Sequence, residues 1–218
     1  MTVLAADTWT SNAGLIADVA AVHLHADMHT LDATHGRGIW WQQWRPHRLH
    51  TIDLATTAHV RADFRHLPFP AAVFDLVAYD PPYCAHGGRS TSTMTDYNER
   101  YGRHIAPPSA AATQQLINDG LTEALAVTRP GGLLLVKCAS YVWSGRLWPG
   151  RHLTASHALD HGATIVDEFT HVGRSRPQPA RTKADGTPST QQHARQNAST
   201  LYLFRAPRLP ERTLWAAA

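Results

Sequence analysis

The chain has 218 residues, 43% of them hydrophobic, and a net charge of +3, which fit a single globular domain over residues 1–218 with a sizeable buried core. No apolar run approaches the roughly 20 residues that a membrane-spanning helix needs, and the N-terminus lacks the basic and apolar segments of a secretory signal. The two cysteines, Cys84 and Cys138, lie far apart, which argues against a disulfide framework or a zinc ribbon and favours a cytoplasmic protein.

The N-terminal part begins with a predicted helix and a strand. Ser11 is a favourable helix N-cap, and the apolar periodicity after it predicts a helix over residues 12–23. A short strand that ends at Asp32 follows. A second helix is predicted over residues 39–44, because Pro46 disfavours helical backbone in the residue before it.

The rest of the chain continues this alternation of strands and helices. Strands are predicted over residues 49–53, 59–62, 74–79, 133–137, 163–172 and 200–205, and helices over residues 113–127 and 153–161. Such alternation indicates an α/β fold with a mostly parallel sheet and helices on both faces. The last two strands have no helix between them, which indicates an antiparallel strand at one edge. Residues 84–108 and 173–199 carry no regular pattern, and loops of this length are often functional.

A glycine-containing turn follows the first strand, in H-T-L-D-A-T-H-G-R-G at residues 29–38. Gly36 and Gly38 let the backbone approach a ligand closely, and the helix after the turn presents free N–H groups. An ordinary strand-to-helix turn has the same pattern, so the motif alone leaves both interpretations open. The tryptophans of the next helix are expected to pack in the core rather than to stack on a base: Trp40, Trp41 and Trp44.

Acidic residues end the next two predicted strands. Asp53 lies about 20 residues after Asp32, the spacing at which Rossmann-type domains hold a ribose hydroxyl. Asp63 ends the third strand, where a carboxylate can accept a hydrogen bond from an adenine amino group. Each residue is also an ordinary turn residue, but three carboxylates at successive strand ends favour a nucleoside site.

The fourth strand, F-D-L-V-A-Y, ends in the tetrad Asp80-Pro81-Pro82-Tyr83. An exocyclic amine of a nucleic-acid base is a poor nucleophile, because its lone pair is delocalised into the ring. A carboxylate and a backbone carbonyl held by rigid prolines can accept both amine hydrogens and direct the lone pair at a methyl donor. Tyr83 is expected to stack on a base turned out of its helix. The tetrad therefore indicates methylation of a base amine.

With these motifs in this order, the chain resembles the S-adenosylmethionine-dependent amino-group DNA methyltransferases of the D-P-P-Y type. It looks closest to small DNA-methylase-like proteins of phage and bacterial genomes. The similarity covers residues 32–137 and is expected to extend over the whole length, with shared stretches such as G-G-L-L-L-V-K-C at 131–138 and H-A-R-Q-N at 193–197. It implies a Rossmann-like class I methyltransferase fold, with a mostly parallel seven-stranded sheet and an antiparallel edge strand, and S-adenosylmethionine as the cofactor.

The resemblance also implies roles for individual residues. It assigns the tetrad to catalysis, Asp53 to the ribose and Asp63 with Phe64 to the adenine. The residues expected to bind the cofactor are Ser11, Asn12, Asp32, Thr34, Gly36, Gly38, Asp53, Asp63 and Phe64. Thr34 stands where the family often has an aromatic residue, and His35 stands in a turn usually made of small residues, which bears on the detailed cofactor geometry.

Basic residues concentrate in the C-terminal part and suggest a polyanionic partner. From residue 174 onward, Asp185 and Glu211 stand against eight basic residues: Arg174, Arg176, Arg181, Lys183, Arg195, Arg205, Arg208 and Arg212. The residues expected to contact nucleic acid are Arg89, Arg100, Arg103, Arg174, Arg176, Arg181 and Lys183. A solvated tail and a lid over the cofactor are the alternatives. The 15 histidines form no convincing set of metal ligands, so no metal is expected.

The favoured function is methylation of adenine N6 in DNA, because aspartate begins the tetrad where cytosine-N4 enzymes of the family more often have serine. One alternative is an RNA methyltransferase that acts on guanine N2 or adenine N6. Another is a non-catalytic protein that has the methyltransferase fold and binds nucleic acid. No separate target-recognition domain is evident, so any sequence specificity is expected from residues 84–108 and 173–199 or from a partner.

Overall fold

The structure, a computed structural model, describes residues 8–54, 57–83, 109–173, 186–187, 190, 192–194 and 196–208. The helices are α1 (Asn12–His23), the 3₁₀ helix η1 (Ile39–Trp41), α3 (Ala110–Val127) and α4 (Gly150–Asp160). The main sheet contains β1 (Thr8–Trp9), β2 (His29–Asp32), β3 (Arg48–Asp53), β4 (Val60–Arg61), β5 (Phe74–Tyr79), β6 (Thr128–Cys138), β9 (Thr164–Val172) and β10 (Ala198–Arg205). A separate hairpin consists of β7 (Tyr141–Trp143) and β8 (Arg146–Trp148).

Apart from β7 and β8, the described strands form one eight-stranded sheet in the order β1-β9-β10-β6-β5-β2-β3-β4. All neighbouring pairs are parallel except those of β10, which is antiparallel to both β6 and β9. The predicted mostly parallel α/β fold is confirmed. The antiparallel pair β9–β10 lies toward one edge, and β1 adds a strand outside it that the sequence patterns did not predict.

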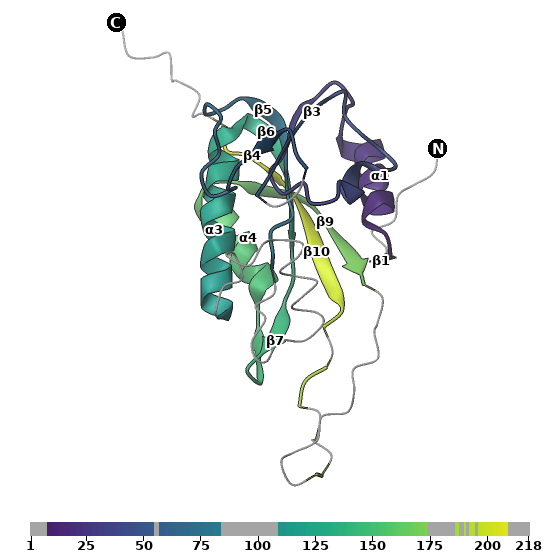
Figure 1. Cartoon of the computed structure of the whole chain (residues 1–218), viewed down its shortest axis with the longest axis vertical. Helices are drawn as coiled ribbons and strands as arrows, with labels where there is room; N and C mark the ends of the chain where they lie inside the picture. The colour runs from purple at the N-terminus through teal and green to yellow at the C-terminus, as the bar shows by residue number, and fades with distance from the viewer. Residues whose placement is uncertain are drawn as a thin grey trace, which may run out of the picture.

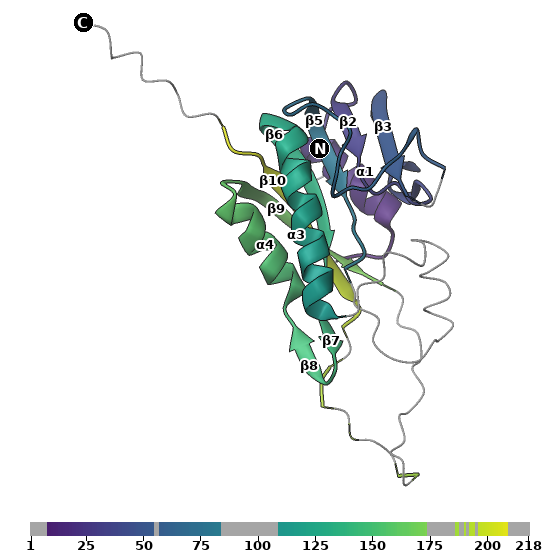
Figure 2. The same cartoon turned by 60° about the vertical axis from the view of Figure 1, so that its left-hand side comes forward.

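Helices cover both faces of the sheet, as Figures 1 and 2 show. One core cluster joins α3 and α4 to the sheet, and a second joins α1 and η1 to the opposite face. Successive residues of β5 alternate between them, with Val77 in the first cluster and Ala78 in the second. A strand that is buried on both faces has a continuous run of apolar residues, which explains why the sequence predicted strands at 74–79 and 133–137.

Three helices differ in extent from the predictions. α3 begins at Ala110 because Ser109 caps it, accepting a hydrogen bond from the backbone N–H of Ala112 at 3.1 Å. α4 begins three residues earlier than expected, at Gly150, where the backbone passes close to the carbonyl of Ala139. The helix predicted over 39–44 is wrong in its extent: only the 3₁₀ helix η1 forms, and the chain then turns toward β3.

The β7–β8 hairpin was also absent from the predictions. Its two-residue turn uses Ser144 and Gly145, both with positive φ (47° and 76°), as hairpin turns that match strand twist require. Each strand has only three residues, too few for a clear alternating pattern. The hairpin follows β6 and extends from the carboxyl end of that strand (Figure 2).

Candidate active site at the carboxyl ends of β2, β3 and β5

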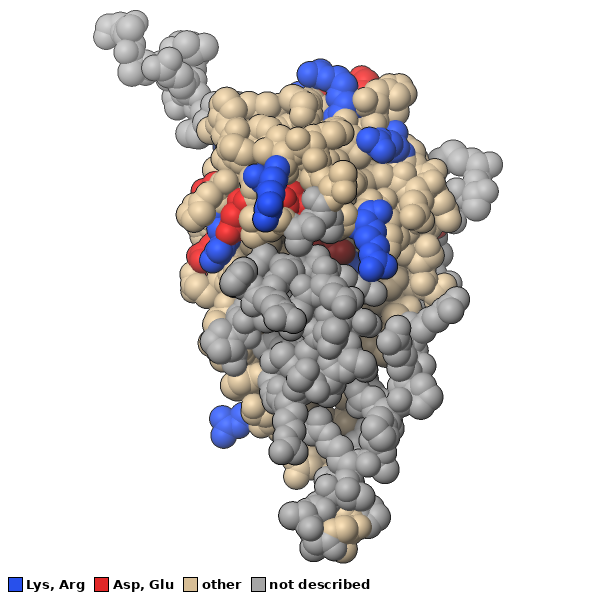
Figure 3. Space-filling view, in the orientation of Figure 1, with Lys and Arg blue, Asp and Glu red and all other residues tan. Residues whose placement is uncertain are grey.

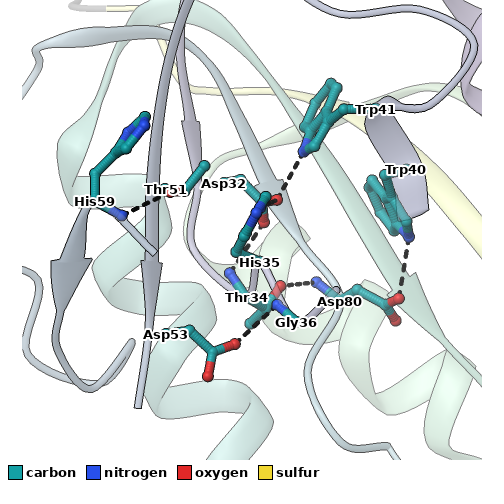
Figure 4. Close-up of polar contacts among 10 residues, drawn as sticks. All are labelled: Asp32, Thr34, His35, Gly36, Trp40, Trp41, Thr51, Asp53, His59 and Asp80. Atoms are coloured by element: carbon teal, nitrogen blue, oxygen red, sulfur yellow. Dashed lines mark hydrogen bonds and ion pairs between the residues drawn. The ribbon is translucent and has the colours of Figure 1, made fainter. Parts of the chain in front are cut away.

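Three carboxylates meet where neighbouring parallel strands end. Asp32 and Asp53 are the last residues of β2 and β3, and Asp80 directly follows β5. Since β2 pairs in parallel with both β3 and β5, all three lie at the same edge of the sheet, where ligands of open α/β folds bind. Figure 4 shows these side chains around the turn that follows β2.

Asp32 holds that turn together. Its Oδ1 accepts a hydrogen bond from the backbone N–H of Thr34 at 3.1 Å, and its Oδ2 accepts one from Trp41 Nε1 at 2.7 Å. His35 Nδ1 lies 2.9 Å from the same Oδ2, and the Asp32 side chain is buried. Both carboxylate oxygens therefore have partners within the protein, and direct contact with a cofactor stays a prediction for this residue.

Gly36 and Gly38 have the conformations that the motif requires. Their φ angles are +55° and +65°, a region that residues with a Cβ rarely adopt. A Cβ on Gly38 would lie 3.0 Å from the His35 ring, so the imidazole occupies the space beside this glycine. The turn accommodates a histidine because the residue facing it has no side chain.

Asp53 connects the glycine turn to a pocket. Its Oδ2 accepts a hydrogen bond from the backbone N–H of Gly36 at 2.8 Å. The pocket is lined by Ala33, Thr34, Asp53, Leu54, Ala62, Phe64, Asp80 and Pro82. It combines two carboxylates with the apolar surfaces of Phe64 and Pro82, which suits a ligand that has hydroxyl groups and a flat apolar ring. One cavity is thus lined by five residues of the predicted site: Thr34, Asp53, Phe64, Asp80 and Pro82.

Asp63 has a different environment from the one expected. Its carboxylate forms an ion pair with Arg65, with Nη2 and Oδ2 2.6 Å apart, and also accepts the backbone N–H of Arg65. These contacts lower the pKa of Asp63, although burial opposes them. Asp63 is not among the residues that line the pocket, whereas Phe64 is. A hydrogen bond from Asp63 to an adenine amine stays a prediction, and it would have to share the carboxylate with Arg65.

Asp80 lies between the glycine turn and η1. Its backbone N–H donates to Thr34 Oγ1 at 2.7 Å, and its Oδ2 accepts a hydrogen bond from Trp40 Nε1 at 3.1 Å (Figure 4). Pro81 and Pro82, which follow it, are buried. The corner after β5 therefore contacts the glycine turn directly and is held by two rigid residues.

The pKa of Asp80 is raised from its ordinary value. Burial is the largest cause, because it disfavours the charged form, and the negative charge of Asp32 adds to it. The positive charge of Lys137 and the hydrogen bond from Trp40 act in the opposite direction. Titratable groups with shifted pKa values in a pocket are frequent at functional sites.

Tyr83, the last residue of the tetrad, packs against the core cluster on the α3 side of the sheet and is partly buried. For Tyr83 to stack on a base, the base would have to contact the part of its ring that the core cluster leaves exposed. All seven basic residues assigned to nucleic-acid contact lie outside the described residues, as do all of 84–108 and, within 173–199, residues 174–185, 188–189, 191 and 195. On the face in Figure 3, the described Lys and Arg side chains lie apart from one another, and some lie beside acidic ones.

Ser11 and Asn12 lie at the start of α1. Ser11 caps the helix, accepting a weak hydrogen bond from the backbone N–H of Gly14 at 3.4 Å. Asn12 Oδ1 accepts a hydrogen bond from Lys137 Nζ at 2.6 Å. Lys137 had no predicted role, although a lysine within the apolar run L-L-L-V-K-C of a buried strand indicates that its ammonium group has a buried partner.

The described residues contain no group of three or more His, Cys, Asp or Glu side chains that could hold a metal ion. The tryptophans are packed as expected: Trp40 and Trp41 are buried in the α1 cluster, and Trp44 packs against it. What the sequence patterns did not show is that the first two also donate hydrogen bonds to Asp80 and Asp32. None of the helices in the described ranges is both long and apolar enough to cross a membrane.

No protein-family model and no curated protein matches this sequence. Solved structures match its fold. The MccD protein is 12% identical with a TM-score of 0.56, and the match covers 90% of this chain and 99% of that one. A candidate methyltransferase of Bacillus halodurans C-125 is 14% identical with a TM-score of 0.51, over 89% and 98% of the two chains. The N-methyltransferase NodS from Bradyrhizobium japonicum WM9, solved with S-adenosyl-L-homocysteine, is 16% identical with a TM-score of 0.49, over 82% and 78%.

At these identities the likeness concerns the fold. The mostly parallel sheet, with its antiparallel strand β10 and helices on both faces, is a Rossmann-like class I methyltransferase fold.

Proposed function

We propose that this chain transfers a methyl group from S-adenosylmethionine to an exocyclic amino group of a nucleic-acid base, with adenine N6 in DNA as the favoured target. The observation that carries this proposal is the contact between the two motifs. The tetrad corner reaches the glycine turn through the 2.7 Å hydrogen bond from Asp80 to Thr34, and Asp80 lines the same pocket as Asp53 and Phe64. A methyl donor bound in that pocket would therefore lie close to an amine held at Asp80.

The residues of the pocket suit the parts of this cofactor. Asp53 would accept hydrogen bonds from the ribose hydroxyls, and Phe64 with Ala62 would contact the adenine ring. The glycine turn adjoins the pocket through the hydrogen bond from the backbone N–H of Gly36 to Asp53, which lines it. When bound, the cofactor would supply an electrophilic methyl group on a positively charged sulfur, and the amine nitrogen held at Asp80 would be its acceptor.

The role of the tetrad is to prepare the amine. The Asp80 carboxylate accepts one amine hydrogen and a backbone carbonyl of the proline pair accepts the other, so that the nitrogen lone pair turns away from the ring. After transfer the nitrogen carries an extra proton, which passes to the Asp80 carboxylate and then to water. Rigid placement of amine and donor in this way contributes several kcal/mol, up to about 7–11 in favourable cases.

The experiment compares wild type, Asp80→Ala and the exposed control Asp27→Ala. Each is incubated with isotopically labelled S-adenosylmethionine and either DNA or RNA, and the methylated nucleosides are identified by mass spectrometry. We expect N6-methyladenine in DNA from wild type and from Asp27→Ala, and a loss of about 100-fold or more in Asp80→Ala. Calorimetry should show that Asp80→Ala still binds the cofactor.

Different outcomes separate the alternatives. Methylated guanine or adenine in RNA alone would make this an RNA enzyme with the same site. Full activity in Asp80→Ala would overturn the role of the tetrad. If wild type does not bind S-adenosylmethionine even at high micromolar concentration, a non-catalytic nucleic-acid-binding protein is the better interpretation.

A further inference from the structure

Lys137 places a buried positive charge beside the tetrad. Its side chain is only 3% exposed, at the carboxyl end of β6. An ammonium group that leaves water needs hydrogen-bond acceptors and a compensating negative charge. Asn12 Oδ1, 2.6 Å from Nζ, is a neutral acceptor and supplies no charge. The negative charge has to come from another residue or from a ligand.

The strand register puts Asp80 next to Lys137. β5 and β6 are parallel, with Tyr79 opposite Val136, so the residues that follow each of them are adjacent. Tyr79 and Val136 both belong to the cluster on the α3 face. Because side chains alternate along strands, Asp80 and Lys137 both lie on the other face, toward α1 and η1. Their contacts agree with this, since Asp80 meets Trp40 of η1 and Lys137 meets Asn12 of α1.

Among the charged groups that affect Asp80, Lys137 is the one that compensates its negative charge. Toward Asp80, the negative charge of Asp32 on β2 raises the pKa, whereas Lys137 lowers it and Trp40 helps as a neutral donor. Cys138 on β6 also senses Asp80, but burial keeps the pKa of its thiol so high that it stays uncharged. On β9, burial and the charge of Lys137 lower the pKa of His171 to about 4, so this imidazole adds no second cation at neutral pH.

We propose that Lys137 is the counter-ion of Asp80: a positioning residue that keeps the Asp80 carboxylate ionised and, through Asn12, ties the start of α1 to the catalytic corner. The inference rests on the proposed function. A carboxylate only accepts hydrogen bonds, whereas a protonated carboxyl group donates one, and an amine that must give up both hydrogens to acceptors needs the ionised form. In this proposal Lys137 does not touch the transferred methyl group.

The test uses three substitutions of Lys137 that separate charge from hydrogen bonding. Lys137→Gln keeps a donor for Asn12 but removes the charge, Lys137→Met removes both, and Lys137→Arg keeps both. The first readout is the titration of the Asp80 carboxyl carbon by NMR in protein labelled with carbon-13 aspartate, assigned by the signal missing in Asp80→Asn. The second is the pH dependence of kcat/KM for methyl transfer.

We expect the midpoint of Asp80 to rise by about one pH unit in Lys137→Gln and Lys137→Met, and to return toward wild type in Lys137→Arg. The acidic limb of kcat/KM should move by the same amount, which is about a tenfold loss at a fixed pH on that limb. A purely structural lysine would lower stability or activity at every pH without moving the midpoint.

An unchanged Asp80 midpoint in folded Lys137→Gln overturns the inference. Lys137→Gln keeps a hydrogen-bond donor for Asn12, so this variant and Lys137→Arg decide the inference. If wild type transfers no methyl group, the proposed function fails, and the NMR titration still tests the charge pair on its own. If wild type is active and only the midpoint fails to move, the proposed function stands and the role of Lys137 falls.

Discussion

Trp40 and Trp41 are neighbours in η1 that donate hydrogen bonds to different carboxylates. Trp40 Nε1 donates to Asp80 beside the pocket, and Trp41 Nε1 donates to Asp32 inside the glycine turn. Both rings are buried, 8% and 5% exposed. Replacement by phenylalanine keeps most of the apolar contact of either ring and removes only the N–H donor. The pair therefore offers a matched comparison between the carboxylate that we propose for catalysis, Asp80, and the carboxylate that holds the glycine turn, Asp32.

We predict that Trp40→Phe lowers kcat for methyl transfer by about 10- to 150-fold, which corresponds to about 1.5–3 kcal/mol for a hydrogen bond to a charged group. Its free energy of unfolding should change less than that of Trp41→Phe. In Trp41→Phe the buried Asp32 loses its shortest hydrogen bond, and we expect a loss of about 2 kcal/mol in stability. Urea denaturation and the methyl-transfer assay measure the two effects. If Trp40→Phe and Trp41→Phe lost the same stability and had the same activity, the two tryptophans would not have the different roles assigned to them.

At the scale of the element, the packing of α3 on β5 depends on a glycine. A Cβ on Gly120 would lie 2.2 Å from the hydroxyl oxygen of Tyr79 and 2.5 Å from the ring of Phe64. The Tyr79 hydroxyl donates to the backbone carbonyl of Ile117 at 3.1 Å, so the ring cannot move away without losing that bond. Gly120 therefore sets how closely the helix approaches the strand that carries Asp80.

We predict that Gly120→Ala destabilises the protein by about 1–3 kcal/mol through overpacking. Helix propensity alone predicts the opposite sign, a gain of about 1 kcal/mol, because alanine favours a helix more than glycine does. The control is Gln115→Ala on the exposed side of the same helix, for which we expect a change within about 0.5 kcal/mol. A stabilised Gly120→Ala protein in urea denaturation would show that the close approach of α3 is not required.

The elements that the sequence predicted well are those whose signal is local. β5 has the predicted limits, residues 74–79, because it is an apolar run that ends at a proline pair. α1 likewise has its predicted cap and extent, residues 12–23. β1 has two residues and pairs with β9, which is far along the chain, so no local pattern marks it. η1 stops early because tertiary hydrogen bonds to its tryptophans, rather than helix periodicity, decide the backbone there.

At the scale of the whole molecule, the sequence predicted which carboxylates share an edge of the sheet but not what each one contacts. Strand ends in a parallel sheet bring Asp53 and Asp80 together whatever the helices do. The bond between Lys137 and Asn12 joins residues 125 positions apart, and the pair between Asp63 and Arg65 depends on side-chain conformation. Contacts of this kind follow from strand register and helix packing, which a pattern of residue types does not specify.

His171 makes the stability of the whole fold depend on pH. It lies on β9 opposite Trp9 of β1, with Ser199 Oγ of β10 3.4 Å from its Nδ1, and burial is the main reason that its pKa falls from 6.5 to about 4. Between these two values the unfolded chain binds a proton at this residue and the folded chain does not. The contribution of His171 to stability is therefore fully present above pH 6.5 and is lost as the pH falls toward 4.

We predict that the free energy of unfolding of wild type falls more between pH 7.5 and pH 4.5 than that of His171→Gln, which cannot titrate. The difference should be on the order of 1 kcal/mol, because the imidazole is only partly buried and solvent screens the effect. Burial also lowers the pKa of His50 and His157. Wild type and His171→Gln both retain these residues, so their effect on stability cancels in the comparison. Urea denaturation at the two pH values measures it. Parallel losses in the two proteins would mean that His171 is as accessible to protons in the folded state as in the unfolded one, and that the edge formed by β1, β9 and β10 does not shield it.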